Sequence, residues 1–462
     1  MKDNRLHYSF ALCLLVLVSL MLLWYLPDIS IGSWKFKRVD LLADIRPGQP
    51  VEVDTMQAKV GVGSDSVRAK VDSVARVALT GCKPGITCIE DYSGDSTALL
   101  SFLKAVHELK ENNRKSVRIA MYGDSFIEGD VFCGSLRDTL QALLGGRGVG
   151  YVPITSEVAG FRNTIKHQFG HWRTFSLISK KDSTVNAEIG PAGFCFLPKT
   201  DAWVEYKPSK QRYLREFSIV KLYYKNQGKA VLHYTVNDST QDSVALRTSG
   251  HLREWKYYKG KPSSIKFQFA HADSLQLYGA SFEDAEGIYV DNFSLRGNSG
   301  IVLHNIADDM YQEFNQYRDY KLVILQYGLN VVREDSLNYT WYAERMIRVV
   351  NKIKRVFPKA SIVLLSVSDR STNTSGTFRT MRAIPAMRNA QRYIAQQTGV
   401  AFWDLYEAMG GENSMVSFAE GKPVMAAKDY THLNFKGGRK ISQRLVNSLL
   451  YELDKYESTL SP

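Results

Sequence analysis

The tripeptide Gly123-Asp124-Ser125 stands where an apolar segment, "SVRIAMY", gives way to a helix-like segment at 130–145. A glycine permits a sharp turn from strand to helix, and such a turn presents the serine hydroxyl near the start of the helix. The free N–H groups and the dipole at a helix start favour a developing negative charge. Ser125 is therefore predicted to be a nucleophile.

The same tripeptide occurs earlier in the chain and ends at Ser96. The residues before that copy, "TCIEDYS", contain no apolar strand that would carry the serine to a strand-end crevice. Ser96 is predicted to be a turn or N-cap serine.

His432 in "KDYTHLNFKGG" is the predicted general base. A serine hydroxyl is a weak nucleophile until a base takes its proton. Asp429 stands three residues earlier, close enough to orient the imidazole and to stabilise its protonated form. Among the nine histidines of the chain, only His432 has such a partner in a strand-end loop. The competing interpretation is an ordinary surface histidine.

Attack on an ester carbonyl creates an oxyanion, which needs preorganised hydrogen-bond donors. Asn330 lies two residues after Gly328 at the end of an apolar strand, so its amide can reach the same crevice. The segment "LRGNSG" offers Gly297 and Gly300, at which a backbone N–H can approach a substrate closely. The sequence leaves the choice between these two glycines open.

Five apolar strands separated by amphipathic helices position these groups. The segments at 116–123, 287–295, 321–328, 361–368 and 400–406 alternate with helical patterns, which is typical of a parallel, doubly wound α/β sheet. In such sheets the functional crevice lies beyond the carboxyl ends of the strands. We expect Ser125, Asn330, His432 and the glycine loop to meet at that edge.

Between the first two of these strands the hydrophobic period changes to two. Residues 171–286 contain short aromatic or β-branched segments separated by turn residues, which predicts an inserted antiparallel β-sandwich. Trp172, Trp203, Trp255 and the tyrosines at 223–258 form either a sugar-stacking platform or, more commonly, part of the sandwich core.

The N-terminal segment predicts a membrane anchor. Residues 8–26 carry no charge and are long enough to cross a bilayer, and Lys2 and Arg5 before them favour a cytoplasmic N-terminus. A cleaved signal peptide is the alternative, but no small-x-small cleavage site follows. The predicted division is 1–26 as anchor, 27–114 as extension, 115–170 and 287–462 as the α/β part, and 171–286 as the insert. The catalytic part is expected outside the cytoplasm.

Net charge and motifs limit the classes of molecule that the protein is expected to bind. The net charge of +12 fits an anionic polymer or membrane surface, whereas no nucleic-acid-binding motif is present. His167 and His171 lack a third metal ligand nearby, and no phosphate-binding loop follows a strand, so neither metal nor cofactor is expected. Cys82 and Cys88 either close a disulfide or remain two separate thiols.

These motifs together resemble the SGNH or GDSL-type hydrolases. The resemblance covers about 115–170 and 287–455, and the four family blocks stand in order as Gly123-Asp124-Ser125, Gly300, Gly328-Leu329-Asn330, and Asp429-Tyr430-Thr431-His432. It implies a flavodoxin-like sheet, with Ser125, His432 and Asp429 as catalytic triad. It also implies an oxyanion hole made by the N–H groups of Ser125 and Gly300 and the amide of Asn330.

A β-sandwich between the first and second blocks is similar to the arrangement in peptidoglycan O-acetylesterases, whose inserted domain resembles a carbohydrate-binding module. The resemblance therefore implies a serine esterase that removes O-acetyl groups from a cell-wall or exported polysaccharide, without a cofactor. An O-acetyltransferase on the same triad and a non-catalytic glycan-binding or assembly protein are the alternatives.

Overall fold

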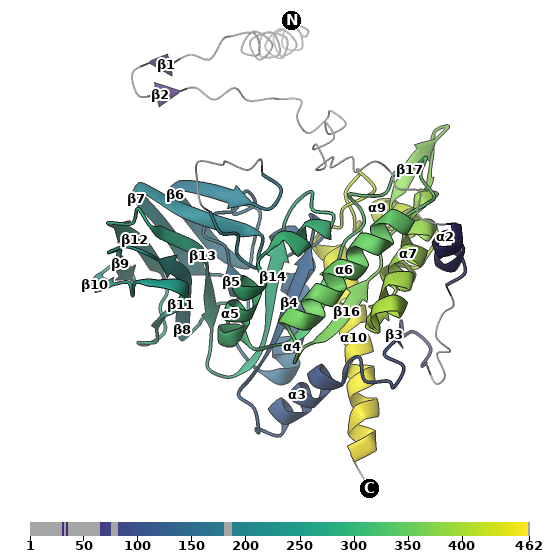
Figure 1. The fold of residues 1–462 in the computed structure, drawn as a ribbon, viewed down its shortest axis with the longest axis horizontal. Coiled ribbons are helices and arrows are strands. Elements are labelled where there is room, and N and C mark those ends of the chain that lie inside the picture. The colour runs from purple at the N-terminus through teal and green to yellow at the C-terminus, as the bar shows by residue number, and fades with distance from the viewer. Residues whose placement is uncertain (1–29, 32–33, 36–64, 75–81, 180–186, 461–462) are drawn as a thin grey trace, which may run out of the picture. The chain divides into compact units, whose positions relative to one another are not determined.

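A computed structural model describes residues 30–31, 34–35, 65–74, 82–179 and 187–460 (Figure 1). The chain divides into two units, 1–55 and 56–462. The described part of the first unit is one antiparallel pair, β1 (Ser30–Ile31) with β2 (Trp34–Lys35). The predicted anchor at 8–26 lies outside the described residues. Within the described ranges, no helix combines the length and the apolar character that crossing a membrane requires.

The second unit is built on a six-stranded sheet. Its strands lie in the order β14 (Gly287–Ser294), β4 (Ser116–Gly123), β15 (Tyr320–Gln326), β16 (Ser361–Leu365), β19 (Ala401–Trp403) and β3 (Ile89–Asp91). The first five are parallel, and β4, β14, β15, β16 and β19 are the five predicted strands. Counted along the chain their order is 2-1-3-4-5, which is the flavodoxin-like order that was expected.

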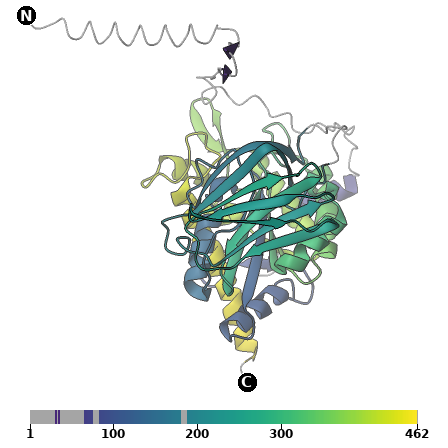
Figure 2. The ribbon, with the colours of Figure 1, turned by 90° about the vertical axis from the view of Figure 1, so that its left-hand side faces the viewer.

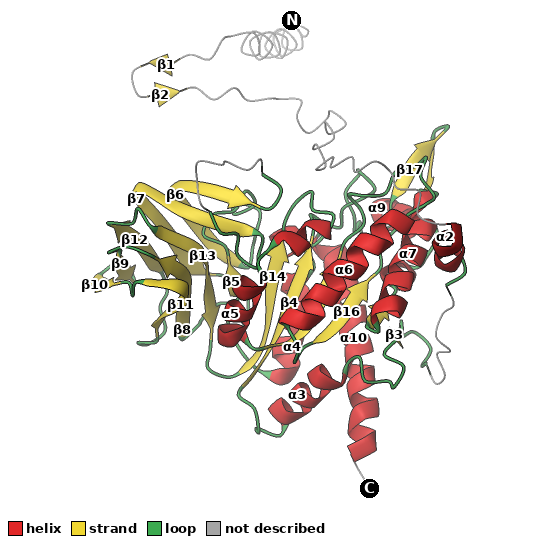
Figure 3. Cartoon of the chain, in the orientation of Figure 1, coloured by secondary structure: helices red, strands yellow, loops and turns green. Residues whose placement is uncertain are grey.

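Helices cover both faces of this sheet, which is why β15 and β16 are mostly apolar and are buried along their whole length. On one face lie α5 (Asp308–Arg318), α6 (Thr340–Val356) and α7 (Ala383–Thr398) (Figure 3). On the other lie α3 (Leu100–Lys110), α4 (Cys133–Leu144) and α10 (Phe435–Leu460). Shorter elements complete the α/β part: η1 (Glu128–Asp130), η2 (Ile301–Asn305), α8 (Leu405–Met409), α9 (Ser414–Glu420) and the hairpin of β17 (Ser371–Thr374) and β18 (Thr377–Thr380).

The predicted extension at 27–114 contributes to this unit. Its strand β3 joins the edge of the sheet and runs antiparallel to β19, with Asp91 opposite Ala401. Helix α2 (Asp65–Asp72) packs against α6 and α7, and Cys82 is bonded to Cys88. Strand β3 has only three residues and two of them are acidic, so it lacks the apolar run by which the equally short β19 was predicted.

Nine antiparallel strands are inserted between β4 and β14, as predicted. They are β5 (Gly150–Val152), β6 (Ile165–Ser176), β7 (Phe194–Pro208), β8 (Ile219–Asn226), β9 (Val231–Val236), β10 (Thr240–Ala245), β11 (Ser249–Tyr257), β12 (Ile265–Ala270) and β13 (Leu275–Glu283). Figure 2 shows them from the side of the insert. Strands β10, β9, β12, β7 and β6 pair with one another, and so do β5, β13, β8 and β11. The two sets are joined by one pairing between β7 and β13, Phe196 with Leu277, so the nine strands form one continuous sheet around a shared core. The first strand begins at residue 150, before the predicted boundary at 171.

Most of the aromatic side chains in the insert belong to its core. Tyr224, Tyr234 and Tyr257 are buried in the core of the insert, and Trp172 and Trp255 pack against that core. Tyr223 is buried in the cluster that includes the parallel sheet, whereas Tyr258 is 72% exposed. A residue buried in a core cannot stack on a sugar, so the core interpretation is confirmed for the buried tyrosines.

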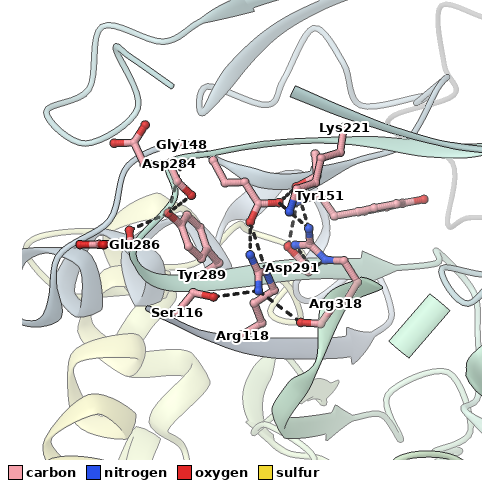
Figure 4. Close-up of polar contacts among 12 residues, drawn as sticks. Ser116, Arg118, Gly148, Tyr151, Lys221, Asp284, Glu286, Tyr289, Asp291 and Arg318 are labelled. Carbon is pink, nitrogen blue, oxygen red and sulfur yellow. Dashed lines mark hydrogen bonds and ion pairs between the residues drawn. The ribbon is translucent and has the colours of Figure 1, made fainter. Parts of the chain in front are cut away.

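A cluster of buried charges lies between the insert and the parallel sheet (Figure 4). Arg318 at the end of α5 contacts Glu283 of β13 and Asp291 of β14, each at 2.6 Å. Glu283 also pairs with Arg118 of β4 at 2.5 Å and with Lys221 of β8 at 3.0 Å. Burial alone would raise the pKa of Glu283, but these cations outweigh it and hold that pKa well below its usual value. The cluster links the insert to β4 and β14.

Candidate active site

Strand β4 ends at Gly123, where neighbouring atoms leave little room for a side chain. A Cβ at this position would stand 2.8 Å from the side chain of Ile127 and 3.0 Å from the carbonyl oxygen of Gln326. The turn leaves Ser125 partly exposed at the carboxyl edge of the sheet. Helix α4 begins only at Cys133, and the 3-10 turn η1 stands between. The predicted helix thus begins three residues later than the expected start at 130.

His432 lies within hydrogen-bond distance of Ser125, with 3.0 Å between Nε2 and Oγ. Its Nδ1 is 2.6 Å from Oδ2 of Asp429, while Oδ1 of Asp429 accepts the backbone N–H groups of Thr431 and His432. Burial raises the pKa of Asp429, but the hydrogen bonds from His432 and Thr431 outweigh burial and lower it to about 2. The carboxylate thus stays ionised and fixes the ring with Nε2 toward the serine.

The loop that carries His432 is supported from a segment that sequence reasoning did not single out. Tyr430 adopts a left-handed backbone conformation with φ of 52°, and its ring stacks on Phe378 at 3.7 Å between centroids. The hydroxyl of Tyr430 donates to Glu420 at 2.6 Å. The hairpin of β17 and β18 therefore holds the loop in place. No motif marks such a contact, so nothing in the chain's pattern could have found it.

Asn330 reaches the nucleophile loop through Asp124. Its Nδ2 donates to Oδ2 of Asp124 at 3.0 Å and to the backbone oxygen of Asn298 at 3.1 Å. Asp124 is fully buried and also accepts the backbone N–H of Phe126 at 2.9 Å. Burial raises the pKa of Asp124 to about 6. The amide of Asn330 lies at the predicted edge, with both of its hydrogens engaged.

The glycine loop fits the expectation at Gly297 better than at Gly300. The N–H of Gly300 donates to Oδ1 of Asn298 at 2.7 Å, so it is already engaged. Gly300 is also buried, with the ring of Tyr327 only 2.8 Å from where its Cβ would stand. Gly297 is partly exposed and follows Arg296, which lines the pocket described below. In the structure as it stands, the N–H of Gly300 is engaged by Asn298, and this contact favours Gly297 of the two glycines that the sequence left open.

A pocket of about 240 Å³ contains both reacting side chains. It is lined by Ser125, Glu128, Val131, Val158, Phe161, Arg296, His432 and Leu433. A larger hollow of about 710 Å³ lies over β7, β9, β10 and β12 and is lined by neither Ser125 nor His432. Because chemistry needs the nucleophile and its base, the smaller pocket is the candidate active site.

Asp130 fixes the loop that follows Ser125, a role for which the sequence carried no signal. Its Oδ2 accepts from Arg137 at 3.1 Å, from Arg162 at 2.8 Å and from Thr164 at 2.5 Å. Its Oδ1 accepts from Asn292 of β14 at 2.8 Å. Burial would raise the pKa of Asp130, but the two arginines lower it. Arg162 follows Phe161, so the same contacts also hold one wall of the pocket.

The remaining sequence candidates lie elsewhere. Ser96 stands in an exposed turn with φ of 60°, in agreement with the predicted turn serine. The reason given for that prediction was wrong, because strand β3 does precede Ser96; β3 runs antiparallel to β19, so its carboxyl end lies at the edge of the sheet opposite to that of Ser125. His167 is buried with Nε2 3.0 Å from the backbone oxygen of Ile154, whereas His171 is exposed. The described residues contain no group of three or more His, Cys, Asp or Glu side chains arranged to bind a metal ion.

Comparison with known proteins finds likeness at the level of structure. No family model and no curated protein sequence matches the chain. A solved structure described as "Peptidoglycan O-acetylesterase in action" matches with a TM-score of 0.63 and 22% identity, over 79% of this chain and 99% of that one. A family two carbohydrate esterase from Cellvibrio japonicus has a TM-score of 0.26 and 10% identity, over 63% of this chain and 98% of that one. The chain therefore shares its fold with the first of these solved structures.

Proposed function

We propose that this chain is a serine esterase that removes O-acetyl groups from a glycan. The observation that supports this most directly is the line of contacts from Ser125 through His432 to Asp429, at 3.0 Å and 2.6 Å, inside a pocket. A hydroxyl, an imidazole and a carboxylate in this order are the arrangement that acyl transfer through a covalent intermediate requires.

In the proposed reaction, His432 Nε2 takes the proton of Ser125 Oγ as that oxygen attacks the ester carbonyl. The carbonyl oxygen gains negative charge, and we assign its stabilisation to the N–H groups of Ser125 and Gly297. His432 then gives its proton to the departing sugar oxygen, and an acyl-enzyme remains. Water attacks this ester with His432 again as base, which releases acetate and restores Ser125.

Asn330 assists the oxyanion only after it exchanges a hydrogen bond. Both of its amide hydrogens are held, one by Asp124 and one by the backbone of Asn298. A substrate carbonyl oxygen that reaches the pocket would compete with these acceptors for one hydrogen. In the resting state the same two bonds fix the amide near the nucleophile turn.

The proposed acyl group is small. Val131, Val158, Phe161 and Leu433 provide an apolar lining, and the whole pocket has about 240 Å³. The methyl group of an acetyl ester suits such a lining. Because the same pocket must also hold part of the sugar, little room is left for a larger acyl group. The shared fold of the peptidoglycan O-acetylesterase supports a glycan as the alcohol part, with acetylated peptidoglycan as the first candidate.

We further propose that the enzyme works outside the cytoplasm on a membrane anchor at 8–26. The uncharged segment with Lys2 and Arg5 before it supports the orientation. The bond between Cys82 and Cys88 supports an oxidising compartment, because disulfides persist there and are rare in the cytosol.

The test is mass spectrometry of O-acetylated cell-wall and capsule fragments before and after incubation with the full chain in detergent. The esterase predicts a loss of acetyl groups and the appearance of free acetate. A gain of acetyl on an unmodified glycan, in the presence of an acetyl donor, would establish the transferase instead. Glycan binding with neither change would support the non-catalytic alternative.

A further inference from the structure

Arg296 is a pocket residue to which the acyl-transfer steps give no role. It stands on the loop between β14 and η2 and lines the same pocket as Ser125 and His432. Its neighbour Gly297 is the candidate oxyanion donor. A charged side chain that close to the reacting ester is expected to affect which substrates fit.

The contacts of Arg296 hold it in place without covering it. One terminal nitrogen of its guanidinium lies 2.5 Å from Oε2 of Glu128, a residue of η1. The side chain of Arg296 is 55% exposed, whereas that of Glu128 is 13% exposed. Burial raises the pKa of Glu128, and Arg296 opposes that rise. Glu128 therefore holds the guanidinium by an ion pair, while more than half of the Arg296 side chain stays exposed.

The chemistry of the guanidinium suggests what it binds. It carries five N–H donors in a planar fork and has no acceptor, so it suits a carboxylate with two oxygens. Four other lining residues are apolar, namely Val131, Val158, Phe161 and Leu433. Among the described residues that line this pocket, Arg296 is the only basic side chain apart from His432, and Glu128, its ion-pair partner, is the only acidic one. An anionic group on the substrate thus has one evident partner.

A purely structural role explains these features less well. An exposed ion pair adds only about 0–1 kcal/mol to stability, and the loop is already fixed by the bonds of Asn298 and Gly300. A charged side chain inside a catalytic pocket is harder to explain by folding than by recognition. The chain's net charge of +12 independently favours an anionic polymer.

We propose that Arg296 binds a carboxylate of the substrate, so that the preferred substrate is an acylated glycan with an acidic group on the sugar next to the ester. The proposal rests on the proposed esterase function and names the substrate class of the same site. Binding of the carboxylate would also hold the loop that carries Gly297 against the carbonyl oxygen.

The test compares two esters that differ only in this charge. One is a mono-acetylated methyl glucuronoside, and the other is the mono-acetylated methyl glucoside, in which a hydroxymethyl group replaces the carboxylate. The wild-type protein is expected to prefer the acidic ester by about tenfold or more in kcat/KM, because a charge-assisted hydrogen-bond pair is worth that much. Arg296→Gln should bring the ratio near one, mainly by raising KM for the acidic ester. Arg296→Lys should keep part of the preference.

Arg215→Gln is the matched control, since Arg215 is exposed and lies outside the pocket lining. It should leave the ratio at the wild-type value. The proposal is overturned if the wild-type protein treats both esters alike, or if Arg296→Gln slows both equally and the ratio persists. Failure of the wild-type protein to hydrolyse either ester or para-nitrophenyl acetate would instead refute the proposed function itself.

Discussion

The charged residues around Arg318 and those around Ser125 differ in what surrounds them. In the first group, Arg318, Glu283 and Asp291 are fully buried, and each charge faces an opposite one (Figure 4). In the second, His432 and Asp429 keep 38% and 47% of their side chains exposed. A substrate cannot reach the buried charges around Arg318, whereas it can reach the half-exposed side chains of His432 and Asp429.

This difference indicates that the two regions serve different ends. Removing the partner of a buried charge lowers the free energy of unfolding by several kcal/mol, so we expect the Arg318 cluster to stabilise the packing of the insert on the parallel sheet. Half-exposed charges contribute little to the stability of the fold. Those around Ser125 are expected instead to stabilise the transition state of the proposed reaction. Substitutions in the two regions should accordingly change different measurements.

Ser125→Ala should produce the largest effect. Without the nucleophile, kcat for a chromogenic acetate should fall by about 10⁴-fold to 10⁶-fold, while the thermal unfolding midpoint stays the same. Ser96→Ala is the matched control, because it changes the other copy of the tripeptide and should keep full activity. Undiminished turnover by Ser125→Ala would show that the residues around Ser125 are not the catalytic region.

Asp429→Asn should come next. The amide can no longer hold His432 in the tautomer that accepts the serine proton, so kcat should drop by about 10⁴-fold. The carboxylate is half-exposed, so the free energy of unfolding at neutral pH should change little. Steady-state kinetics and urea unfolding on the same preparation check both halves. A large loss of stability with a normal kcat would contradict the assignment of Asp429 to catalysis and not to folding.

Arg318→Met tests the buried region. It leaves Asp291 and Glu283 without their shared partner, so the free energy of unfolding should fall by about 3–5 kcal/mol. Arg355→Met is its control, since Arg355 pairs with Asp308 but is 59% exposed; that change should cost about 1 kcal/mol or less. Equal effects of the two substitutions would show that burial does not set the difference.

Asp124 combines features of both regions, because it is fully buried and yet joins Asn330 to the nucleophile turn. Its pKa in the folded protein is about 6, above that of an ordinary carboxyl in the unfolded chain. The contribution to stability is therefore fully present below about pH 4 and lost as pH rises through 6, amounting to roughly 3 kcal/mol at most. Urea unfolding of the wild type and of Asp124→Asn across this range should diverge accordingly. Parallel curves would contradict this assignment.

Most of the α/β part could be predicted from the sequence. Five apolar segments could be predicted to be strands because a strand buried on both faces is apolar, and the motifs at their carboxyl ends indicate one edge of the sheet. Ser125, His432 and Asp429 were found because their types and local spacing match a known chemistry. The structure places them within hydrogen-bond distance although hundreds of positions separate Ser125 from His432.

What the sequence missed depends on contacts between distant segments. The hydrogen bond from Gly300 to Asn298, which favours Gly297 as the donor, is not revealed by any spacing. Asp130 and Tyr430 support the site through partners on other strands and loops. Strand β3 is short and two of its three residues are acidic, so it offered no apolar run. The N-terminal anchor and the compartment stay predictions.

Covalent labelling of Ser125 tests the central proposal most directly. We expect a fluorophosphonate to add once to the intact wild-type protein, with the adduct on the peptide that contains Ser125, and to add far more slowly to His432→Ala. Mass spectrometry of intact and digested protein reads both outcomes. No adduct on the folded wild-type protein, or an adduct on Ser96 in place of Ser125, would contradict the proposed mechanism.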